Sequence, residues 1–322
     1  MSGFAYRVVD GRAQAVDHDA ALVDEAGADE AGFGWVHLDG IGDAEQDWLR
    51  TRARLDEVVV ETLTTTESRP RCDVFDRSAF LNLRGLTEAE TSTSDPLASI
   101  RIYAAKGRVI SVTRSRLTAM AAVRARVEAG EVMDPGDLIA AFADEITAEL
   151  DPEVAELGDS LDDCEEALDA NRVFELRQQV NRVRSRSIGY RRFLNPQRTA
   201  LEKLAQLDAA WLEDDDRIHL AAAADRAARM AEELEAIRER ASLTHDALTD
   251  LRAEQIDNRG LLISVIAVVF LPLTFVTGLY GMNVKGIWFA EEPWAFDGIA
   301  TLCLVVAAGS ALWFVSQHWF RK

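Results

Sequence analysis

Two long uncharged segments near the C-terminus dominate the hydrophobic pattern of the chain. The first covers residues 260–280 and the second covers residues 298–317, with a short polar loop between them. Each is long enough to cross the hydrocarbon core of a bilayer, since a membrane-spanning helix needs about 20 apolar residues. The residues before them contain no such segment. The pattern predicts a membrane protein in which a large polar body is attached to a hairpin of two transmembrane helices.

The first part of the chain has the pattern of a mixed α and β domain. Segments 43–54 and 56–65 have helical spacing, and the turn signal Lys106-Gly107 separates two strand-like runs. Helical spacing prevails from Arg116 onward, and we assign residues 1–133 to the α/β domain. The expected strands are 6–9, 13–16, 34–39, 79–84, 99–104 and 109–113.

Residues 134–210 are predicted to form a helical hairpin with separated charges. Acidic residues fill 153–169 without an intervening base, and arginines fill 172–198 with Glu175 as the single acid. An acidic helix that turns back at 169–171 on a basic helix would form a salt-bridged antiparallel pair. Alternatively, the surplus carboxylates bind divalent cations, because Mg²⁺ and Ca²⁺ prefer oxygen ligands. Pro196 is expected to kink or end the basic helix.

A single very long helix is predicted from residue 214 to residue 280. The triplet Asp214-Asp215-Asp216 suits a helix start, where negative charge meets the positive end of the macrodipole; a metal site is the alternative role. No proline or glycine follows until Gly260. At about 1.5 Å per residue, such a helix is roughly 100 Å long and must be bundled with copies of itself. We assign 211–259 to the stalk, 260–283 to the first span and 298–318 to the second.

One face of this helix continues from the stalk into the membrane. Its members recur in steps of three and four, so they share one side of the helix. Facing the axis of a bundle, they would place carboxylate rings below a narrow tube of small and apolar residues, as in cation pores. Alternatively, the acids are a solvated face and the rest is helix packing. The face comprises Asp246, Asp250, Ala253, Asp257, Gly260, Ile263, Ala267, Leu271, Thr274, Gly278 and Gly281.

Charges around the two spans predict their orientation. The flanking bases are Arg252, Arg259, Arg321 and Lys322, whereas the loop 284–297 carries Lys285 against Glu291, Glu292 and Asp297. Because positive residues concentrate on the cytoplasmic side, both termini are expected in the cytoplasm and the loop outside. The fold class is thus an α+β cytoplasmic domain with a long helical stalk and two C-terminal transmembrane helices.

Composition narrows the function classes. The net charge of −20 argues against nucleic acid as a partner and favours cations. The scattered cysteines, Cys72, Cys164 and Cys303, encode neither a disulfide framework nor a zinc ribbon. The first 115 residues contain no phosphate loop and no nucleophile motif, so we expect no enzyme and no cofactor. A membrane-tethered scaffold or sensor is the other class to consider.

Residues 270–283 read FLPLTFVTGLYGMN and close the first span with Gly-Met-Asn. This segment resembles the signature of the CorA superfamily of divalent-cation transporters. Its zinc-transporting, ZntB-type branch is similar in WVHL at 35–38, ESRPR at 67–71, IRIY at 100–103, RRFLNPQR at 191–198 and VKGI at 284–287. The likeness covers nearly the whole chain. It implies a homopentameric funnel in a bacterial inner membrane, with an axial pore from the first span and the second span packed outside.

The resemblance places the pore mouth at Gly281, Met282 and Asn283. Gly281 would let the chain leave the helix, and five Asn283 amides would offer neutral oxygens to the water shell of a dication. Met282 is expected to pack and fix the turn, because a thioether is a soft ligand. Glu291 and Glu292 would stand back and raise the local concentration of cations.

The transported metal is expected to be zinc, with magnesium, cobalt or nickel as the alternative. Zinc prefers nitrogen and sulfur ligands, yet the pore face carries neither, so zinc would pass as the hydrated ion. Methionine at position 282 is the residue typical of the magnesium branch. The zinc branch resembles proton-linked importers and the magnesium branch gated channels, and the spans contain no carboxylate that could carry protons.

Overall fold

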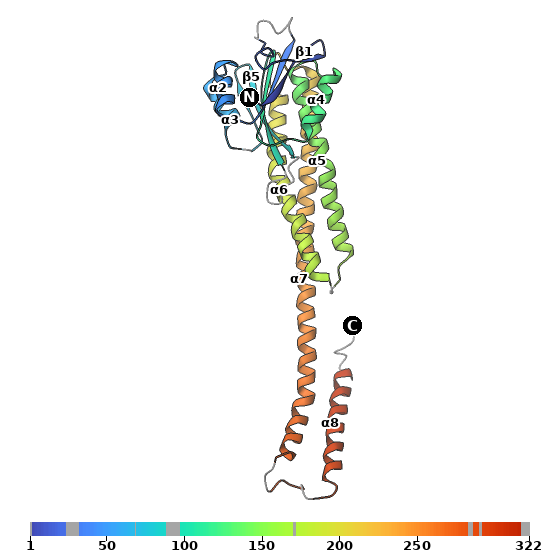
Figure 1. Cartoon of the computed structure of the whole chain (residues 1–322). Coiled ribbons are helices and arrows are strands. Elements are labelled where there is room, and N and C mark those ends of the chain that lie inside the picture. The colour runs from blue at the N-terminus through green and yellow to red at the C-terminus, as the bar shows by residue number, and fades with distance from the viewer. Residues whose placement is uncertain are drawn as a thin grey trace. The chain divides into compact units, whose positions relative to one another are not determined.

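The computed structural model describes residues 2–23, 32–67, 69–87, 97–169, 172–282, 286–289 and 292–316. The chain divides into two compact units (Figure 1). Unit 1 comprises Met1–Ala167 and Glu175–His245, and unit 2 comprises Leu168–Phe174 and Asp246–Lys322. The division falls within the long helix predicted from the sequence.

Unit 1 contains a seven-stranded sheet with the strand order β2-β1-β3-β7-β6-β5-β4. The only parallel neighbours among these strands are β3 and β7; the other neighbours are antiparallel. All six expected strands are present, and β4 is an additional strand at the edge. The strands are β1 (Gly3–Val9), β2 (Arg12–Ala15), β3 (Phe33–Asp39), β4 (Arg71–Phe75), β5 (Ser78–Leu86), β6 (Leu97–Ala105) and β7 (Arg108–Thr113).

Helices cover both faces of the sheet. Alternation along β3 places Val36 and Leu38 in a core with α2 (Asp43–Thr51) and α3 (Glu57–Thr64). Trp35, on the opposite face, contacts Phe142 of α5 (Pro135–Glu166) edge to face, with ring centroids 5.8 Å apart. The helix α4 (Ala119–Ala129) contacts α5 and β2. The sheet is therefore buried between two layers, which suits its nearly continuous apolar central strands.

The basic helix does not end at its proline. The helix α6 spans Val173–Ala205 with Pro196 inside it, so of the two expected effects of Pro196, a kink or an end of the helix, the end was wrong. A proline in a helix interior removes one backbone hydrogen bond. Leu194, Ala200 and Leu201, on either side of it, are at most 2% exposed. Tertiary burial of these side chains holds both halves of the helix in place despite the lost bond.

The acidic and basic helices do not form a closed two-helix unit. Arg186 pairs with Glu153 across α5 and α6 at 3.3 Å, as expected. However, Arg191 of α6 pairs with Glu235 of α7 at 3.1 Å. Arg240 of α7 pairs with two acids of α5, Asp162 and Glu165. The third helix therefore supplies part of the charge compensation that the sequence pattern assigned to the hairpin alone.

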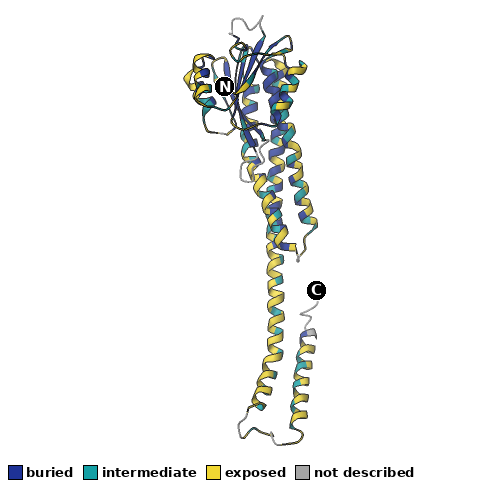
Figure 2. Cartoon of the chain, viewed as in Figure 1, coloured by how far each residue is buried: buried dark blue, intermediate teal, exposed yellow. Residues whose placement is uncertain are grey.

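The long helix is continuous. The helix α7 runs over 67 residues, Asp214–Tyr280, and confirms the predicted limits. The second span is α8, Ala295–Ser316. Both helices are long and apolar enough to cross a membrane, and their most apolar stretches have mean hydropathies of 2.5 and 1.8. Their side chains within unit 2 are almost all exposed or half-buried (Figure 2), which is typical of surfaces that face lipid or other subunits.

Candidate pore and its mouth

A stripe of half-buried residues runs along the span of α7. Its members recur every three or four residues, while the positions between them are exposed. The span of α8, in the same compact unit, has a corresponding series of less exposed positions at Ile299, Cys303, Ala307, Ser310 and Phe314. Two antiparallel helices that cover one face of each other produce this pattern. We call the α7 series the covered stripe: Leu261, Val265, Val269, Leu273, Val276 and Tyr280.

The residues predicted to line the pore lie on the opposite side of α7. Ile263 stands midway between Leu261 and Val265, and Ala267 stands midway between Val265 and Val269. Two residues correspond to a rotation of about 200°, so midway positions point away from the covered stripe. All the predicted members are exposed, and we call them the pore stripe: Gly260, Ile263, Ala267, Leu271, Thr274 and Gly278.

The acids predicted below the membrane share the exposed side. Asp246, Asp250 and Asp257 are exposed and enter no ion pair with the residues that the structure describes. A row of unpaired carboxylates on one helix face carries its charge into the solvent. Their geometry is therefore compatible with attraction of cations.

The described part of the mouth follows directly after α7. Gly281 N–H still donates to the carbonyl of Thr277 at 2.9 Å, and Met282 is 53% exposed. The hydroxyl of Tyr280 donates to the carbonyl of Trp288 at 3.2 Å, which ties the end of the helix to the loop. Glu292 is exposed. Asn283 and Glu291, predicted as pore mouth and loop acid, lie outside the described residues.

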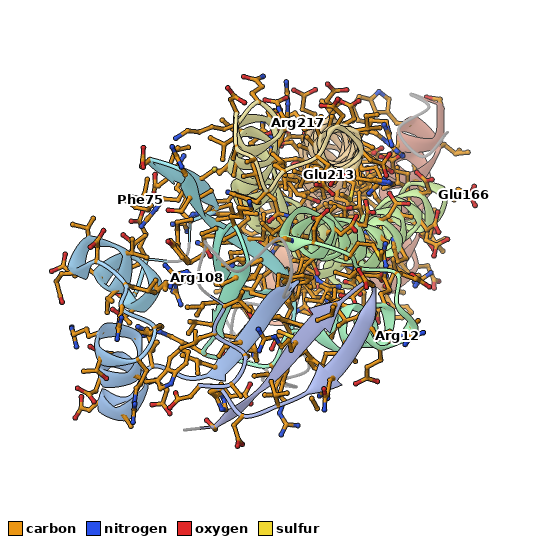
Figure 3. The ribbon with its side chains drawn as sticks, turned by 90° about the horizontal axis from the view of Figure 1, so that it is seen from above. Arg12, Phe75, Arg108, Glu166, Glu213 and Arg217 are labelled. Atoms are coloured by element: carbon orange, nitrogen blue, oxygen red, sulfur yellow. The ribbon has the colours of Figure 1, made fainter. Side chains whose placement is uncertain are left out.

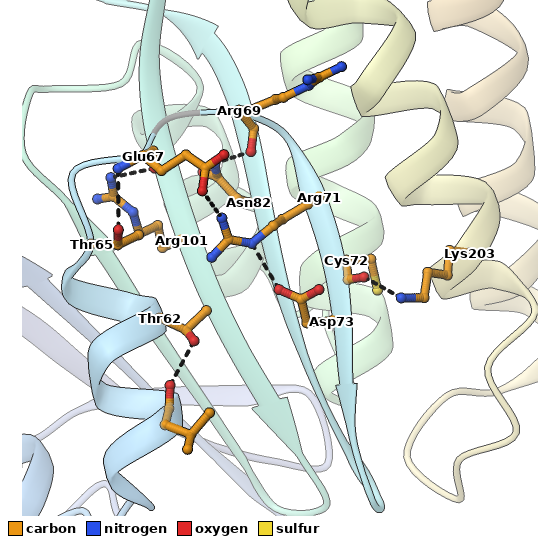
Figure 4. A network of polar contacts seen from close by, with 11 residues as sticks. Thr62, Thr65, Glu67, Arg69, Arg71, Cys72, Asp73, Asn82, Arg101 and Lys203 are labelled. Atoms are coloured by element: carbon orange, nitrogen blue, oxygen red, sulfur yellow. Dashed lines mark hydrogen bonds and ion pairs between the residues drawn. The ribbon is translucent and has the colours of Figure 1, made fainter.

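Two of the motifs that resemble the zinc branch have structural roles. Arg71 donates to Glu67 at 2.7 Å and to Asp73 at 2.8 Å, beside the edge strand β4 (Figure 4). Gln197 of α6 accepts the backbone N–H of Arg84 at 2.8 Å and thereby joins α6 to β5. The Arg71 pairs lie along the edge strand and the Gln197 bond joins a helix to the sheet, and no metal chemistry is needed to explain them.

The buried charge beside this edge was not predicted. Arg101 is 2% exposed and donates to the carbonyl of Glu67 at 3.2 Å. Burial, with contributions from Arg114 and Arg71, lowers its pKa to about 10. Only the strand alternation of β6, which places Arg101 on the same face of the sheet as Val112, could have indicated it.

Among the residues that the structure describes, no group of three or more His, Cys, Asp or Glu side chains could hold a metal ion. Cys72, Cys164 and Cys303 form no disulfide. Asp216, in the first turn of α7, accepts the backbone N–H of Glu213 at 2.7 Å and so stabilises the start of this helix. Glu213 and Arg217 are labelled in Figure 3. The predicted role of the acid triplet as a helix start is confirmed.

Comparisons with known proteins agree with this architecture. The family model described as CorA-like Mg2+ transporter protein matches residues 30–322. The divalent cation transporter CmaX of Pseudomonas aeruginosa is 33% identical over 289 residues, which are 88% of this chain and 86% of CmaX. The zinc transport protein ZntB of Pectobacterium atrosepticum is 27% identical over 286 residues, 88% of this chain and 87% of that protein. The solved structure of full-length CmaX matches with a TM-score of 0.78 at 29% identity and covers 98% of both chains.

Proposed function

This chain belongs to the CorA family of divalent-cation transporters, and we propose that it carries zinc into the cell through an axial pore of a homopentamer. The observation that carries the proposal is the opposition of the two stripes on α7. A helix whose apolar neighbour covers one side can face an axis only with the other. That other side holds the small and apolar residues of the pore stripe together with Asp246, Asp250 and Asp257.

The mouth of this pore is proposed to be a ring of Asn283 amides. Neutral oxygens bind the water shell of a dication weakly enough for the ion to leave again, whereas carboxylates at the same place would retain it. Gly281 and Met282 position this ring at the end of α7. Both termini are proposed to lie in the cytoplasm, because the bases flank the outer ends of the spans.

Zinc is proposed because ZntB proteins match over most of the chain and the ESRPR and RRFLNPQR segments resemble that branch. The second candidate is a magnesium channel, which is favoured by Met282 and by the name of the matching family model. Proton-linked transport would need a titratable group on the ion path. The segments 260–280 and 298–316 contain no Asp, Glu or His, so any linkage would have to act outside the bilayer.

The deciding experiment is flux into liposomes that contain the purified protein. Entry of Zn²⁺ and of Mg²⁺ is followed separately with fluorescent indicators, with and without an imposed pH gradient. We expect zinc entry that Asn283→Ala abolishes while the oligomer, measured by light scattering, stays intact.

Asn258→Ala is the matched control. Asn258 is exposed on α7 at about 200° from Gly260, on the side of the covered stripe. Loss of the Asn258 amide should leave metal entry into the liposomes unchanged. Undiminished entry in Asn283→Ala would refute the assigned mouth, and magnesium entry without zinc entry would select the second candidate.

A further inference from the structure

A pocket lies at the carboxyl ends of the two parallel strands. After β3 the chain continues into α2 and α3, which pack on one face of the sheet, and after β7 it continues into α4, which contacts α5 and β2. The backbone N–H of Gly40 donates to the carbonyl of Thr113 at 2.7 Å, so the two strand ends stay joined. Open sheets bind small ligands in the crevice where successive connections diverge in this way.

A chain of hydrogen bonds leads from the core to this pocket and fixes a histidine. Trp35 Nε1–H donates to Ser111 Oγ at 2.9 Å, and Ser111 Oγ lies 2.8 Å from His37 Nδ1. Because Ser111 already accepts from Trp35, its own hydroxyl proton is available to His37 Nδ1. His37 Nε2 lies 3.2 Å from Asp39 Oδ1, and a carboxylate oxygen can only accept, so Nε2 carries a proton in this contact. His37 is 1% exposed, so this arrangement is rigid.

The same tautomer leaves one buried donor directed at the pocket. Thr113 Oγ1 lies 3.3 Å from His37 Nε2, which carries the proton in this contact. Thr113 Oγ1 can accept there but cannot donate. Its hydroxyl proton has no acceptor among the residues that the structure describes, although Thr113 is only 4% exposed and lines the pocket. A buried hydroxyl that lacks an acceptor costs free energy, which a bound oxygen ligand would recover.

The pocket combines cationic, acidic and apolar walls in a volume of about 280 Å³. Arg116 and Arg124 supply two guanidinium groups, and Arg124 is held over the ring of Phe4 at 4.3 Å. Both arginines, after the dominant hydrogen bond from His37, contribute to a lowered pKa of Asp39. The positive field at Asp39 disfavours a metal cation there. The apolar part of the wall comprises Leu117, Met120 and Ala121.

We propose that this pocket binds a small phosphate monoester that carries hydroxyl groups. Arg116, Arg124 and the hydroxyl of Thr113 would hold the phosphate oxygens, since guanidinium groups match phosphate in geometry and charge. Asp39, whose side chain is 57% exposed, would accept hydrogen bonds from the ligand hydroxyls. The carbon skeleton would lie against Leu117. Such a ligand would use the donors of the arginines and Thr113, the carboxylate acceptor of Asp39 and the apolar wall together. A free anion would be repelled by the negative charge of Asp39.

The test is calorimetric titration of the full chain in detergent with glycerol 3-phosphate, inorganic phosphate and glycerol. We expect glycerol 3-phosphate to bind, inorganic phosphate to bind roughly tenfold more weakly, and glycerol not to bind. Thr113→Val should weaken glycerol 3-phosphate binding roughly tenfold, and Thr113→Ser should restore it. Thr62→Val, on the exposed side of α3, is the control that should change nothing.

Arg124→Gln should remove binding of both phosphates, whereas Asp39→Asn should remove the preference for the ester. The site would be overturned if the unmodified chain did not bind glycerol 3-phosphate. It would also be overturned if Thr113→Val and Arg124→Gln bound this ligand as tightly as the unmodified chain does. Equal affinity for inorganic phosphate and the ester would overturn the assignment to hydroxylated esters. None of these residues lies on α7 or α8, so the variants should show unchanged zinc flux in the absence of the phosphate ester. Failure of the pocket proposal can therefore be told apart from failure of the transport proposal.

Discussion

The carboxylate of Asp216 lies directly against Gly136, where an added Cβ would come within 2.0 Å of Asp216 Oδ2. Only a glycine at the start of α5 allows the start of α7 to approach so closely. Asp216 is 1% exposed, and Asp134 and Asp137 lie close enough for their charges to act on it. Burial, and secondly the charge of Asp134, raise the pKa of Asp216 to about 7. Burial and neighbouring negative charge both favour the protonated form of a carboxyl group.

This contact predicts a stability that falls as pH rises. The pKa of Asp216 in the folded chain exceeds its value in the unfolded chain. The contribution of Asp216 to the free energy of unfolding is therefore fully present below about pH 4 and is lost as pH rises through about 7. Asp216→Asn keeps a neutral hydrogen-bonding group and should remove this dependence, a difference of up to about 3 kcal/mol. Thermal unfolding of the two proteins at pH 5 and pH 8 measures it. Asp214→Asn is the control, since that side chain is fully exposed. Parallel pH profiles for Asp216→Asn and the parent would contradict the raised pKa of Asp216.

Arg240 should fasten the far end of α5 to α7. Its guanidinium pairs with Asp162 and Glu165, and Glu165 also accepts the hydroxyl of Thr244 at 3.0 Å. These groups are partly exposed, so Arg240→Gln should cost only about 1 kcal/mol, and most at low salt. Faster amide hydrogen exchange at the end of α5 is the expected signature. Arg238→Gln breaks only a pair within α7, with Glu235, and should leave that exchange unaltered.

The two stripes of α7 can be distinguished by thiol labelling. Cysteines at Thr274 and Gly278 should react with small water-soluble reagents and be protected by permeant metal, because they face the proposed axis. Cysteines at Leu273 and Val276 belong to the covered stripe and should not react. Cys303 must first be replaced, since it is only half-buried in α8. The reverse labelling pattern would show that α7 presents a different side to the pore.

The loop acids should act at long range. If Glu291 and Glu292 concentrate cations by attraction, changing both to Gln should slow metal uptake severalfold at 0.1 M salt and hardly at 1 M. The Debye length shrinks from about 10 Å to about 3 Å over this range. Uptake rates in liposomes at the two ionic strengths measure the effect. An equal loss at both would indicate direct ligation of the metal.

Local signals were sufficient for the membrane part of the fold. Both ends of α7 were predicted, because an acidic triplet marks its start, no glycine or proline interrupts its stalk, and an uncharged run defines its span. The assignment of small residues to a pore stripe rests on helical periodicity alone and stays a prediction. The position of these residues opposite the covered stripe could not be predicted, because the direction in which a hairpin closes depends on contacts between the two helices.

The missed features all depend on distant contacts. The strand β4 reads RCDVF, and its charged positions hid it, since an edge strand needs burial on fewer sides. Pro196 remains helical because buried neighbours on both sides outweigh one lost hydrogen bond. The contact of Asp216 with Gly136 joins positions 80 apart in the chain, and no local pattern indicates it.

The opposition of the covered stripe and the pore stripe makes the length of α7 a functional property. One residue inserted between Asp257 and Gly260 would rotate every later side chain by about 100° relative to the acids, and the pore stripe would no longer continue their face. Seven inserted residues would rotate it by only about 20°, so a whole heptad could be gained or lost with little change of phase. In the proposed pore, the number of residues in the stalk therefore decides which side chains meet the ion as much as the type of those residues does.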